Sequence, residues 1–355
     1  MQQILEQFQE RVRGAALDRR ALRIRGGGTK DWYGQQLDGE ILDTRAYAGI
    51  VDYEPTELVI TARCGTPLAE IEAVLAERRQ MLAFEPPHFG EAATIGGTIA
   101  AGLSGPRRAN SGALRDFVLG AKLLDGKGEV LSFGGQVMKN VAGYDVSRLL
   151  AGSLGTLGML LEVSVKVLPV PFAETTLRFA MSEPEAIRKL NEWGGQPLPV
   201  SGSCWHDGVL ALRLSGAQAA VDAAVRDLGT RHGGDLMPDC AGFWADLREQ
   251  RHVFFQGDAP LWRLSVPSTA GALDLGPQLI EWGGAQRWLR ADGDAASARR
   301  IRAAVASCGG HATLFRGGDK SAGVFQPLAP ALARIHERLK AGFDPSNIFN
   351  PGRMY

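Results

Sequence analysis

Cysteine is scarce in this sequence, and the cysteines that it has lie far apart. They are Cys64, Cys204, Cys240 and Cys308, and none of them belongs to a Cys-x-x-Cys pair. Zinc and iron–sulfur sites are typically built from such closely spaced pairs, so the spacing argues against a metal site of either kind within this chain. We expect all of the cysteines to be reduced structural thiols.

Net charge and long apolar runs are also lacking. The 39 lysines and arginines balance 39 aspartates and glutamates, and the scattered basic residues form no stripe for nucleic acid. No apolar run reaches the roughly 18 to 20 residues of a membrane span. Residues 1–14 predict a charged surface helix, with no apolar core or cleavage site of a signal peptide. These features predict a soluble, cytoplasmic protein with small-molecule or protein partners.

Two common nucleotide-binding motifs are missing as well. Gly-x-Gly occurs at Gly26–Gly28 and Gly126–Gly128, and neither is followed by the third glycine of Gly-x-Gly-x-x-Gly, which argues against a nicotinamide-binding Rossmann loop. The sequence "GGDKSAG" has Asp319 where a P-loop needs its second glycine. A P-loop ATPase is therefore excluded.

The length of 355 residues predicts two domains. Pro169 and Pro171 end a long β-rich run, so we place a boundary near residue 172. The first part predicts strands, a helix with Thr66 as its N-cap, and a hairpin whose turn is Asp125–Gly128. The second part predicts alternating strands and helices, one of which begins at a capping box from Ser182 to Glu185. Residues 326–355 are turn-rich and separate in character.

What the sequence has in excess is glycine, with 45 residues in 355, about twice the usual share of roughly 7%. Glycine lets backbone N–H groups approach a ligand, and successive N–H groups form a concavity that binds phosphate. The glycines gather in four segments: "RGGGTK" (25–30), "TIGGTIAAGLSG" (94–105), "SGALRDFVLGAKLLDGKGEVL" (111–131) and "DVSRLLAGSLGTLG" (145–158). A cofactor that carries phosphate is the first hypothesis.

This ordered set resembles the FAD-binding domain of the vanillyl-alcohol oxidase and p-cresol methylhydroxylase superfamily. The resemblance implies an α+β fold, with a two-part FAD-binding domain of that type (1–172), a smaller α+β cap domain (173–325) and a C-terminal segment that returns to the FAD domain (326–355). In many relatives a histidine after the first glycine run is bonded to the flavin. Here that position is Thr29 or its neighbour, neither of which is a histidine, so we expect FAD to be bound without a covalent link.

The resemblance also implies which residues bind FAD. Two loops are expected to hold the pyrophosphate, the second with backbone N–H groups: Gly26, Gly27, Gly28, Thr29 and Lys30, then Thr94, Gly96 and Gly97. A third set is expected beside the isoalloxazine ring, and a fourth at the adenosine end: Gly102, Ser104 and Gly105, then Gly152, Ser153, Gly155 and Gly158. Asn350 and Arg353, in the sequence "NPGRM", are expected to contact the flavin.

Longer matches narrow the resemblance. The segments "EPPHFGEAATIGGTIAAGLSGPRRANSGALRDFVLG", "GGQVMKNVAGYDVSRLLAGSLGTLG" and "DPSNIFNPGRMY" are similar to the GlcE-type FAD-binding subunits of bacterial glycolate oxidase. The resemblance implies a complex with a longer flavoprotein subunit and an iron–sulfur subunit, which oxidises glycolate to glyoxylate and passes electrons toward the respiratory chain. It leaves open attachment to the inner face of the cell membrane through that complex.

Catalytic residues are harder to find. Longer relatives carry a Glu-His pair where this chain has Phe315 and Arg316, and metal-binding histidines in the cap that have no counterpart here, so no metal site is expected. His311 and Arg316 remain weak candidates, the arginine for the substrate carboxylate, with a surface ion pair as the alternative. Two hypotheses therefore stay open: an electron-transfer or assembly subunit, and a free-standing FAD-dependent oxidoreductase that acts on a 2-hydroxy acid or another alcohol.

Other residues of the cap and of the loops have two interpretations each. His88, which precedes the second glycine loop, can contact the cofactor or be fixed by Pro86 and Pro87 as an ordinary loop residue. Five tryptophans of the cap can shape a substrate pocket, but we favour core and interface roles: Trp205, Trp244, Trp262, Trp282 and Trp288.

Overall fold

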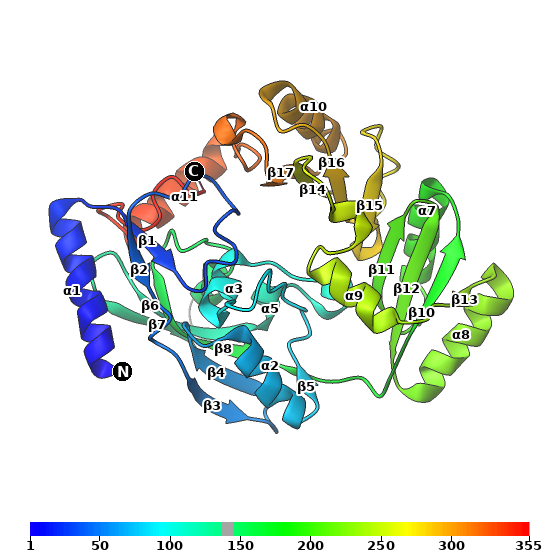
Figure 1. Ribbon diagram of the computed structural model, residues 1–355, viewed down its shortest axis with the longest axis horizontal. Helices are drawn as coiled ribbons and strands as arrows, with labels where there is room; N and C mark the ends of the chain where they lie inside the picture. Colours follow the sequence, from blue (N-terminus) through cyan, green and yellow to red (C-terminus); the bar gives the residue numbers. More distant parts are fainter. Residues whose placement is uncertain (136–144, 355) are drawn as a thin grey trace. The chain divides into compact units, whose positions relative to one another are not determined.

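The computed structural model describes residues 1–135 and 145–354. Residues 136–144, which include "QVMKNVAGY" of the long matching segment, and Tyr355 lie outside the described residues. The chain forms two compact units (Figure 1). Unit 1 comprises residues 1–103, 113–169 and 327–355, and unit 2 comprises residues 104–112 and 170–326.

Unit 1 is a mixed α/β unit around a five-stranded antiparallel sheet with the strand order β3-β4-β8-β6-β7. Its helices are α1 (Gln2–Asp18), α2 (Leu68–Glu77), α3 (Ile95–Ala101), α5 (Leu114–Phe117), α6 (Val146–Leu150) and α11 (Pro330–Phe343). Its strands are β1 (Leu22–Arg25), β2 (Glu40–Asp43), β3 (Ile50–Glu54), β4 (Val59–Arg63), β5 (Gln80–Met81), β6 (Val118–Leu124), β7 (Val130–Gly134), β8 (Met159–Lys166) and β9 (Leu168–Pro169).

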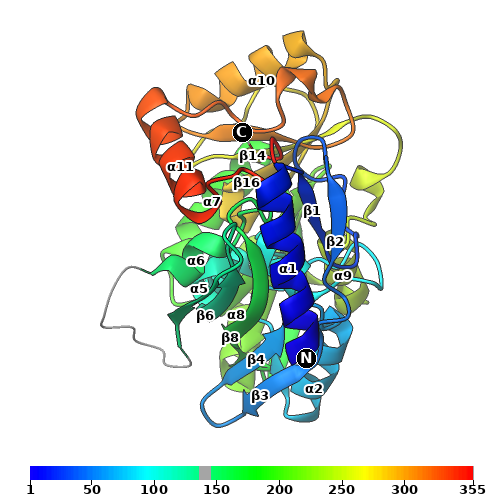
Figure 2. The same ribbon diagram turned by 90° about the vertical axis from the view of Figure 1, so that its left-hand side faces the viewer.

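The N-terminal helix α1 lies beside the parallel pair β1–β2 in both views (Figures 1 and 2). It runs four residues beyond the predicted helix and buries Phe8, Val12 and Ala15. Phe8 packs edge-on against Tyr47, with 6.2 Å between ring centroids. The apolar stripe of α1 therefore belongs to the core of unit 1, while its other face is charged.

The hairpin around Asp125–Gly128 is confirmed, since β6 and β7 pair in antiparallel register across it. Gly128 has a φ of +76°, as the turn requires.

The prediction that Thr66 caps the N-terminus of α2 is wrong. α2 begins after Pro67, and the Thr66 hydroxyl instead bonds the carbonyl of Arg63 at 2.7 Å and the backbone of Gly49. The side chain thus ties two loops together rather than capping the helix.

Unit 2 contains an eight-stranded antiparallel sheet with the order β13-β10-β12-β11-β15-β16-β14-β17. Its helices are α4 (Arg108–Ser111), α7 (Glu183–Gly194), α8 (Gln218–His232), α9 (Cys240–Arg248) and α10 (Ala295–Ala306), with 3-10 turns η1 (Val253–Phe255), η2 (Trp282–Gly284) and η3 (Lys320–Ala322). Its strands are β10 (Ala173–Ala180), β11 (Val200–His206), β12 (Val209–Gly216), β13 (Asp235–Leu236), β14 (Leu261–Ser265), β15 (Gln278–Glu281), β16 (Gln286–Arg290) and β17 (His311–Arg316).

Four of the five tryptophans that were predicted to pack in the core or at an interface are buried in the core. Trp205, Trp244, Trp262 and Trp288 are buried inside unit 2. Trp282 is half-buried and donates from its indole N–H to the carbonyl of Gly105 at 3.0 Å. Ser182 is the N-cap residue of α7, as predicted, but its hydroxyl makes no capping bond.

The short segment 104–112 belongs to unit 2, although the chain on both sides of it belongs to unit 1. Arg107 holds it in place through an ion pair with Glu174 and a 3.3 Å bond to the hydroxyl of Ser215. The guanidinium of Arg108 stacks on Trp282, 4.4 Å from the ring centroid. Within the described part of the chain, no helix is long and apolar enough to span a membrane.

Candidate cofactor-binding site

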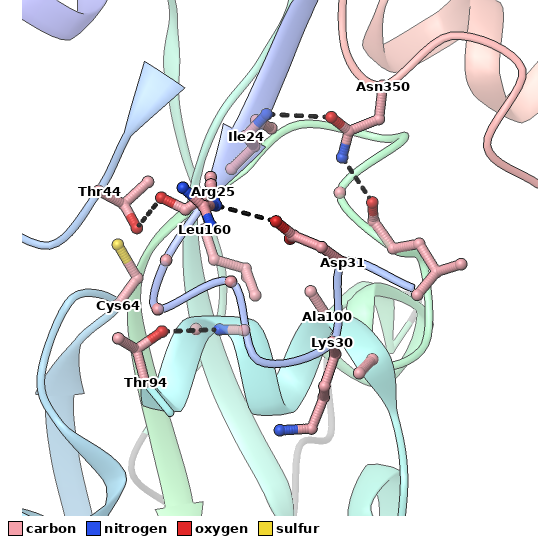
Figure 3. A pocket seen from close by; sticks show the side chains of 18 of the residues that line it. Ile24, Arg25, Lys30, Asp31, Thr44, Cys64, Thr94, Ala100, Leu160 and Asn350 are labelled. Atoms are coloured by element: carbon pink, nitrogen blue, oxygen red, sulfur yellow. Dashed lines mark hydrogen bonds and ion pairs between the residues drawn. The ribbon is translucent and has the colours of Figure 1, made fainter. Parts of the chain in front are cut away.

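A pocket of unit 1 brings together backbone and side chains from distant parts of the chain (Figure 3). Five stretches supply its lining: residues 24–31, Thr44 with Cys64, residues 94–101, residues 153–160 and the C-terminal segment. The lining residues are Ile24, Arg25, Gly26, Gly27, Gly28, Thr29, Lys30, Asp31, Thr44, Cys64, Thr94, Gly96, Gly97, Ala100, Ala101, Ser153, Leu154, Gly155, Gly158, Leu160, Asn350 and Arg353.

The first glycine loop begins where β1 ends, at Arg25. The amide N–H groups of Gly26, Gly27, Gly28 and Thr29 have no acceptor among the described residues, whereas the amide of Asp31 closes a turn onto the carbonyl of Gly28 at 3.2 Å. Buried backbone N–H groups in folded proteins almost always find a partner in the protein, in ordered water or in a ligand. Four successive free donors at a pocket form a concavity suited to an anion such as phosphate.

Glycine is required in this loop because the loop lies directly against the second one. A Cβ on Gly27 would stand 1.5 Å from the carbonyl oxygen of Ala92, and a Cβ on Gly26 would stand 2.3 Å from the hydroxyl of Thr94. Gly28 has a φ of +73°, a conformation that side chains rarely adopt. The bare backbone thus serves close packing as well as access to a ligand.

The charges at the pocket are mostly positive. Arg25, Lys30 and Arg353 line it together with one carboxylate, Asp31, which Arg25 binds through Nε at 2.9 Å. The ammonium of Lys30, which is 9% exposed, donates to the carbonyl of His88 at 3.1 Å. This excess of positive charge suits a diphosphate.

Arg353 is the most unusual of these cations. It is buried, and its Nη2 donates to the carbonyls of Lys30 and Tyr33 at 3.3 and 3.2 Å. Its Nε has no acceptor among the described residues. Burial lowers the pKa of this guanidinium to about 10. A buried donor without a partner at the edge of a pocket is most readily satisfied by an oxygen of a bound ligand.

The second glycine loop is built differently. It precedes α3, whose N-cap Thr94 accepts from the amide of Gly97 at 3.3 Å. The amide of Gly96 donates to the carbonyl of Cys64 at 2.9 Å, and a Cβ on Gly96 would stand 2.5 Å from the Cβ of Cys64. The expectation that Gly96 and Gly97 supply free N–H groups to the ligand therefore conflicts with these two bonds, although both glycines line the pocket.

The remaining predicted residues divide into two groups. Ser153, Gly155, Gly158, Asn350 and Arg353 line the pocket with the first two loops. Gly102, Ser104, Gly105 and Gly152 are not among the lining residues.

Gly102 and Gly152 have a packing role that explains them, because a Cβ on Gly102 would stand 2.7 Å from the Cα of Gly152. Ser104 and Gly105 belong to unit 2, where the carbonyl of Gly105 accepts from Trp282. His88 bonds Glu72 at 2.9 Å through Nε2 and Lys30 through its carbonyl.

The two catalytic candidates lie on one edge strand of unit 2. His311 begins β17 opposite Ser265, and Arg316 ends it opposite Leu261. Five residues of strand separate them by roughly 16 Å, so they do not form one site together. Burial lowers the pKa of Arg316, assisted by the charge of Arg290. Burial also lowers the pKa of His311.

Among the described residues, no three histidine, cysteine, aspartate or glutamate side chains lie close enough together to form a metal site.

Sequence reasoning missed several lining residues because their types carry no motif. Arg25, Asp31, Thr44 and Cys64 are the polar ones. The thiol of Cys64 is fully buried, and burial raises its pKa to about 12, so it stays neutral. Arg25 and Asp31 flank the glycine run directly, and that position was the one signal that could have found them.

The residues that line this pocket are suited to bind the diphosphate part of FAD. The fit rests on the free amides of the first loop and on the unpartnered Nε of Arg353. The two glycine loops pack against each other, and both line the same pocket. The lining by Ile24, Leu154 and Leu160 adds an apolar wall for the uncharged part of a ligand.

Comparisons with known proteins agree with this geometry. Residues 4–134 match the family model described as "FAD binding domain". Solved structures of alkyldihydroxyacetonephosphate synthase share the fold, with TM-scores of 0.67 and 0.68 at 16% and 15% identity, over 97% of this chain and 73% and 74% of theirs. The α+β, FAD-binding fold class predicted from the sequence is therefore confirmed.

Relatives in sequence identify the family to which the chain belongs. Glycolate oxidase subunit GlcD of Bacillus subtilis is 34% identical over 36% of this chain and 27% of its own length. D-lactate dehydrogenase of Archaeoglobus fulgidus is 33% identical over 41% of this chain and 33% of its own. Glycolate oxidase subunit GlcE of Escherichia coli is 51% identical over 98% of this chain and 96% of its own length. The chain belongs to the GlcE family of glycolate oxidase subunits.

Proposed function

We propose that this chain is the FAD-binding subunit of a glycolate oxidase complex that oxidises glycolate to glyoxylate. The observation that carries the proposal is the 51% identity to the GlcE subunit over nearly the whole of both chains. The pocket of unit 1 supports it, because its free amides, positive charge and buried arginine suit the diphosphate of FAD. Partner subunits follow from membership of a subunit family, and the iron–sulfur subunit and the respiratory chain are the proposed electron acceptors.

Each part of the pocket has a proposed task. Bound FAD supplies the chemistry of hydride acceptance at a flavin ring. The amides of Gly26 to Thr29 would bind the diphosphate, and Lys30 and Arg353 would balance its charge. Thr94, Gly97, Ser153, Gly155 and Gly158 would complete the lining, with Gly96 acting through packing on Cys64. The apolar Ile24, Leu154 and Leu160 would pack against the uncharged part of the cofactor.

We further propose that FAD is held without a covalent bond. Thr29 stands where relatives carry a flavin-linked histidine, and the described lining of the pocket contains no histidine. Cys64 is the one cysteine of that lining, and its raised pKa keeps it a neutral thiol, which is a poor nucleophile. Acid precipitation of the purified holoprotein tests this directly, because all of the flavin is expected in the supernatant and none in the protein pellet.

The chain's own task in the complex is proposed to be electron transfer or assembly. Substrate oxidation needs a base and a group for the substrate carboxylate. The two candidates, His311 and Arg316, lie at opposite ends of β17. A directly catalytic, free-standing FAD-dependent oxidoreductase remains the alternative, and the 33% identity to a D-lactate dehydrogenase over 41% of this chain favours keeping it.

One experiment separates these functions. The chain is purified alone and together with its partner subunits, and the visible absorbance of the flavin is recorded anaerobically while glycolate is added. We expect the complex to be bleached rapidly and the isolated holoprotein to keep its oxidised spectrum. Rapid bleaching of the isolated chain would establish the catalytic alternative, and a purified chain that takes up no FAD would refute the cofactor assignment.

A further inference from the structure

The C-terminal segment reaches the pocket by adding itself to β1. The amide of Leu22 donates to the carbonyl of Ile348 at 2.7 Å, and the amide of Asn350 donates to the carbonyl of Leu22 at 2.9 Å. Leu22 and Phe349 form a parallel bridge. Residues 348–350 therefore run as an extra strand beside the one that leads into the first glycine loop.

A buried ion pair fixes this segment to the rest of unit 1. Asp344, which is 1% exposed, accepts from the amides of Ile348 and Phe349 at 3.0 and 2.8 Å and pairs with Lys340 at 2.5 Å. The same ammonium donates to the carbonyl of Thr156 at 2.7 Å. The backbone of residue 350 is thus held in place by the pairing with β1 and by the bonds to Asp344, independently of its own side chain.

The side chain of Asn350 joins two walls of the pocket (Figure 3). Its Oδ1 accepts from the amide of Ile24 at 3.0 Å, two residues before the first glycine. Its Nδ2 donates to the carbonyl of Leu154 at 2.7 Å, in the turn that contains Gly155. The residue is 2% exposed, so both bonds are shielded from water.

Two further features show that this position is specified for asparagine. Asn350 has a φ of +40°, in the left-handed region that asparagine tolerates better than most residues. Gly155 has a φ of +71°, and a Cβ on it would stand 2.8 Å from Nδ2 of Asn350. The left-handed backbone, the two bonds and the missing Cβ opposite all serve one contact between the two walls.

From this geometry we infer that Asn350 is a positioning residue, which sets the spacing between the first glycine loop and the Leu154–Gly155 turn and so tunes FAD affinity from outside the cofactor. The inference rests on the proposed function and differs from the expectation that Asn350 touches the flavin, because its side-chain amide is engaged on protein backbone at both ends. Arg353, three residues on, is the direct contact in this arrangement.

Two variants at this position test the inference. Asn350→Gly keeps the left-handed backbone and removes both side-chain bonds. Asn350→Asp keeps the acceptor for Ile24 but faces the Leu154 carbonyl with a carboxylate, so it loses the second bond. For both we expect the dissociation constant for FAD to rise by about 10- to 100-fold, the range typical when groups that orient the ligands of a metal site are removed. The dissociation constant for ADP, titrated as a probe, is expected to rise with it.

A matched control lies in the same segment. Asn347 is exposed, has a φ of +51° and does not line the pocket. Asn347→Gly is therefore expected to keep wild-type FAD affinity. The visible spectrum of the bound flavin supplies a readout that a purely structural role would not move: we expect its vibronic shoulders to change in both Asn350 variants and to stay unchanged in Asn347→Gly.

The outcomes separate the inference from the function on which it rests. If the wild-type chain binds no FAD, the proposed function fails and the inference fails with it. If the wild-type chain binds FAD and both Asn350 variants bind it equally well, the inference alone is overturned. It is also overturned if the melting temperatures of the apoproteins fall while FAD affinity and spectrum stay unchanged, since Asn350 then serves only the fold.

Discussion

The two glycine loops of unit 1 look alike in sequence but differ in what their backbone does. In the loop from Gly26 to Thr29, the amides have no acceptor among the described residues. In the loop from Thr94 to Gly97, the amides of Gly96 and Gly97 are bonded to the Cys64 carbonyl and to the Thr94 hydroxyl. The first loop offers donors to a ligand, and the second forms the surface on which the first one rests.

The difference shows that a cluster of glycines can serve either of two purposes: close packing of the backbone, or access of a ligand to backbone N–H groups. Gly27 fits because the carbonyl of Ala92 fills the space of its missing side chain, and Gly96 fits because Cys64 does. These are packing needs, and they give no direct sign of a ligand. The free amides beside Gly27 are the feature that points to an anion.

The largest effect is expected from Gly27→Ala. The new methyl group would meet the Ala92 carbonyl oxygen at 1.5 Å, and a backbone atom cannot turn aside as a side chain can. We expect the free energy of unfolding to fall by about 3 kcal/mol, with loss of FAD binding, measured by urea denaturation and flavin titration. Gly14→Ala in α1, where no atom lies within 4 Å, is the control and is expected to be neutral or more stable. Equal stability of the two variants would contradict the packing of the loops.

The next largest effect is expected from a charge placed on the second loop. Gly97 lines the pocket, and a Cβ there would meet only the Thr94 hydroxyl, at 3.3 Å. Gly97→Asp has space to fold but puts a carboxylate beside the diphosphate, so FAD affinity is expected to drop by about 100-fold or more. Gly97→Ala adds the methyl group without the charge and is expected to bind FAD nearly as wild type. A folded aspartate variant with full affinity would remove the second loop from the site.

The sequence predicted the parts of this site that depend on glycine and on the C-terminal motif. Gly26, Gly97, Gly155 and Asn350, spread over more than 300 residues, all line one pocket. The sequence alone could not distinguish glycines that face the ligand from glycines that pack against other backbone. Gly102 and Gly152 were therefore assigned to the cofactor, although their backbones pack on each other.

Ordinary residue types were missed for a related reason. Thr44 follows β2, which pairs with β1, and Cys64 follows β4, which pairs with the distant β8. No residue-type motif marks either position. Thr66 shows the same limit on the fold, because tertiary bonds to Gly49 and Arg63 overrode its preference for a helix cap. The strands, the hairpin and the alternation of elements in unit 2 were predictable, since they follow from local periodicity.

Lys30→Met tests the electrostatic part of the first loop. The substitution keeps an apolar stem but removes the ammonium that lies 3.1 Å from the His88 carbonyl at the pocket. We expect FAD to bind about 10-fold more weakly, with a shallower dependence on salt because one cation fewer faces the diphosphate. Titrations at low and high ionic strength measure both. Lys127→Met, at an exposed turn position, is the control, and an equal loss in both variants would refute a specific role for Lys30.

The smallest effect concerns Cys64, whose carbonyl holds the second loop. Burial raises the pKa of its thiol from 9.0 to about 12, so the unfolded chain loses this proton at a lower pH than the folded one. The contribution of the neutral thiol to the free energy of unfolding is therefore fully present well below pH 9. Between pH 9 and pH 12 it falls by about 1.4 kcal/mol per pH unit. Urea denaturation at pH 8 and pH 10 measures it, and Cys64→Ala should lose less stability than wild type over that interval. Identical losses would show that the thiol is more exposed to solvent than its packing under the second loop implies.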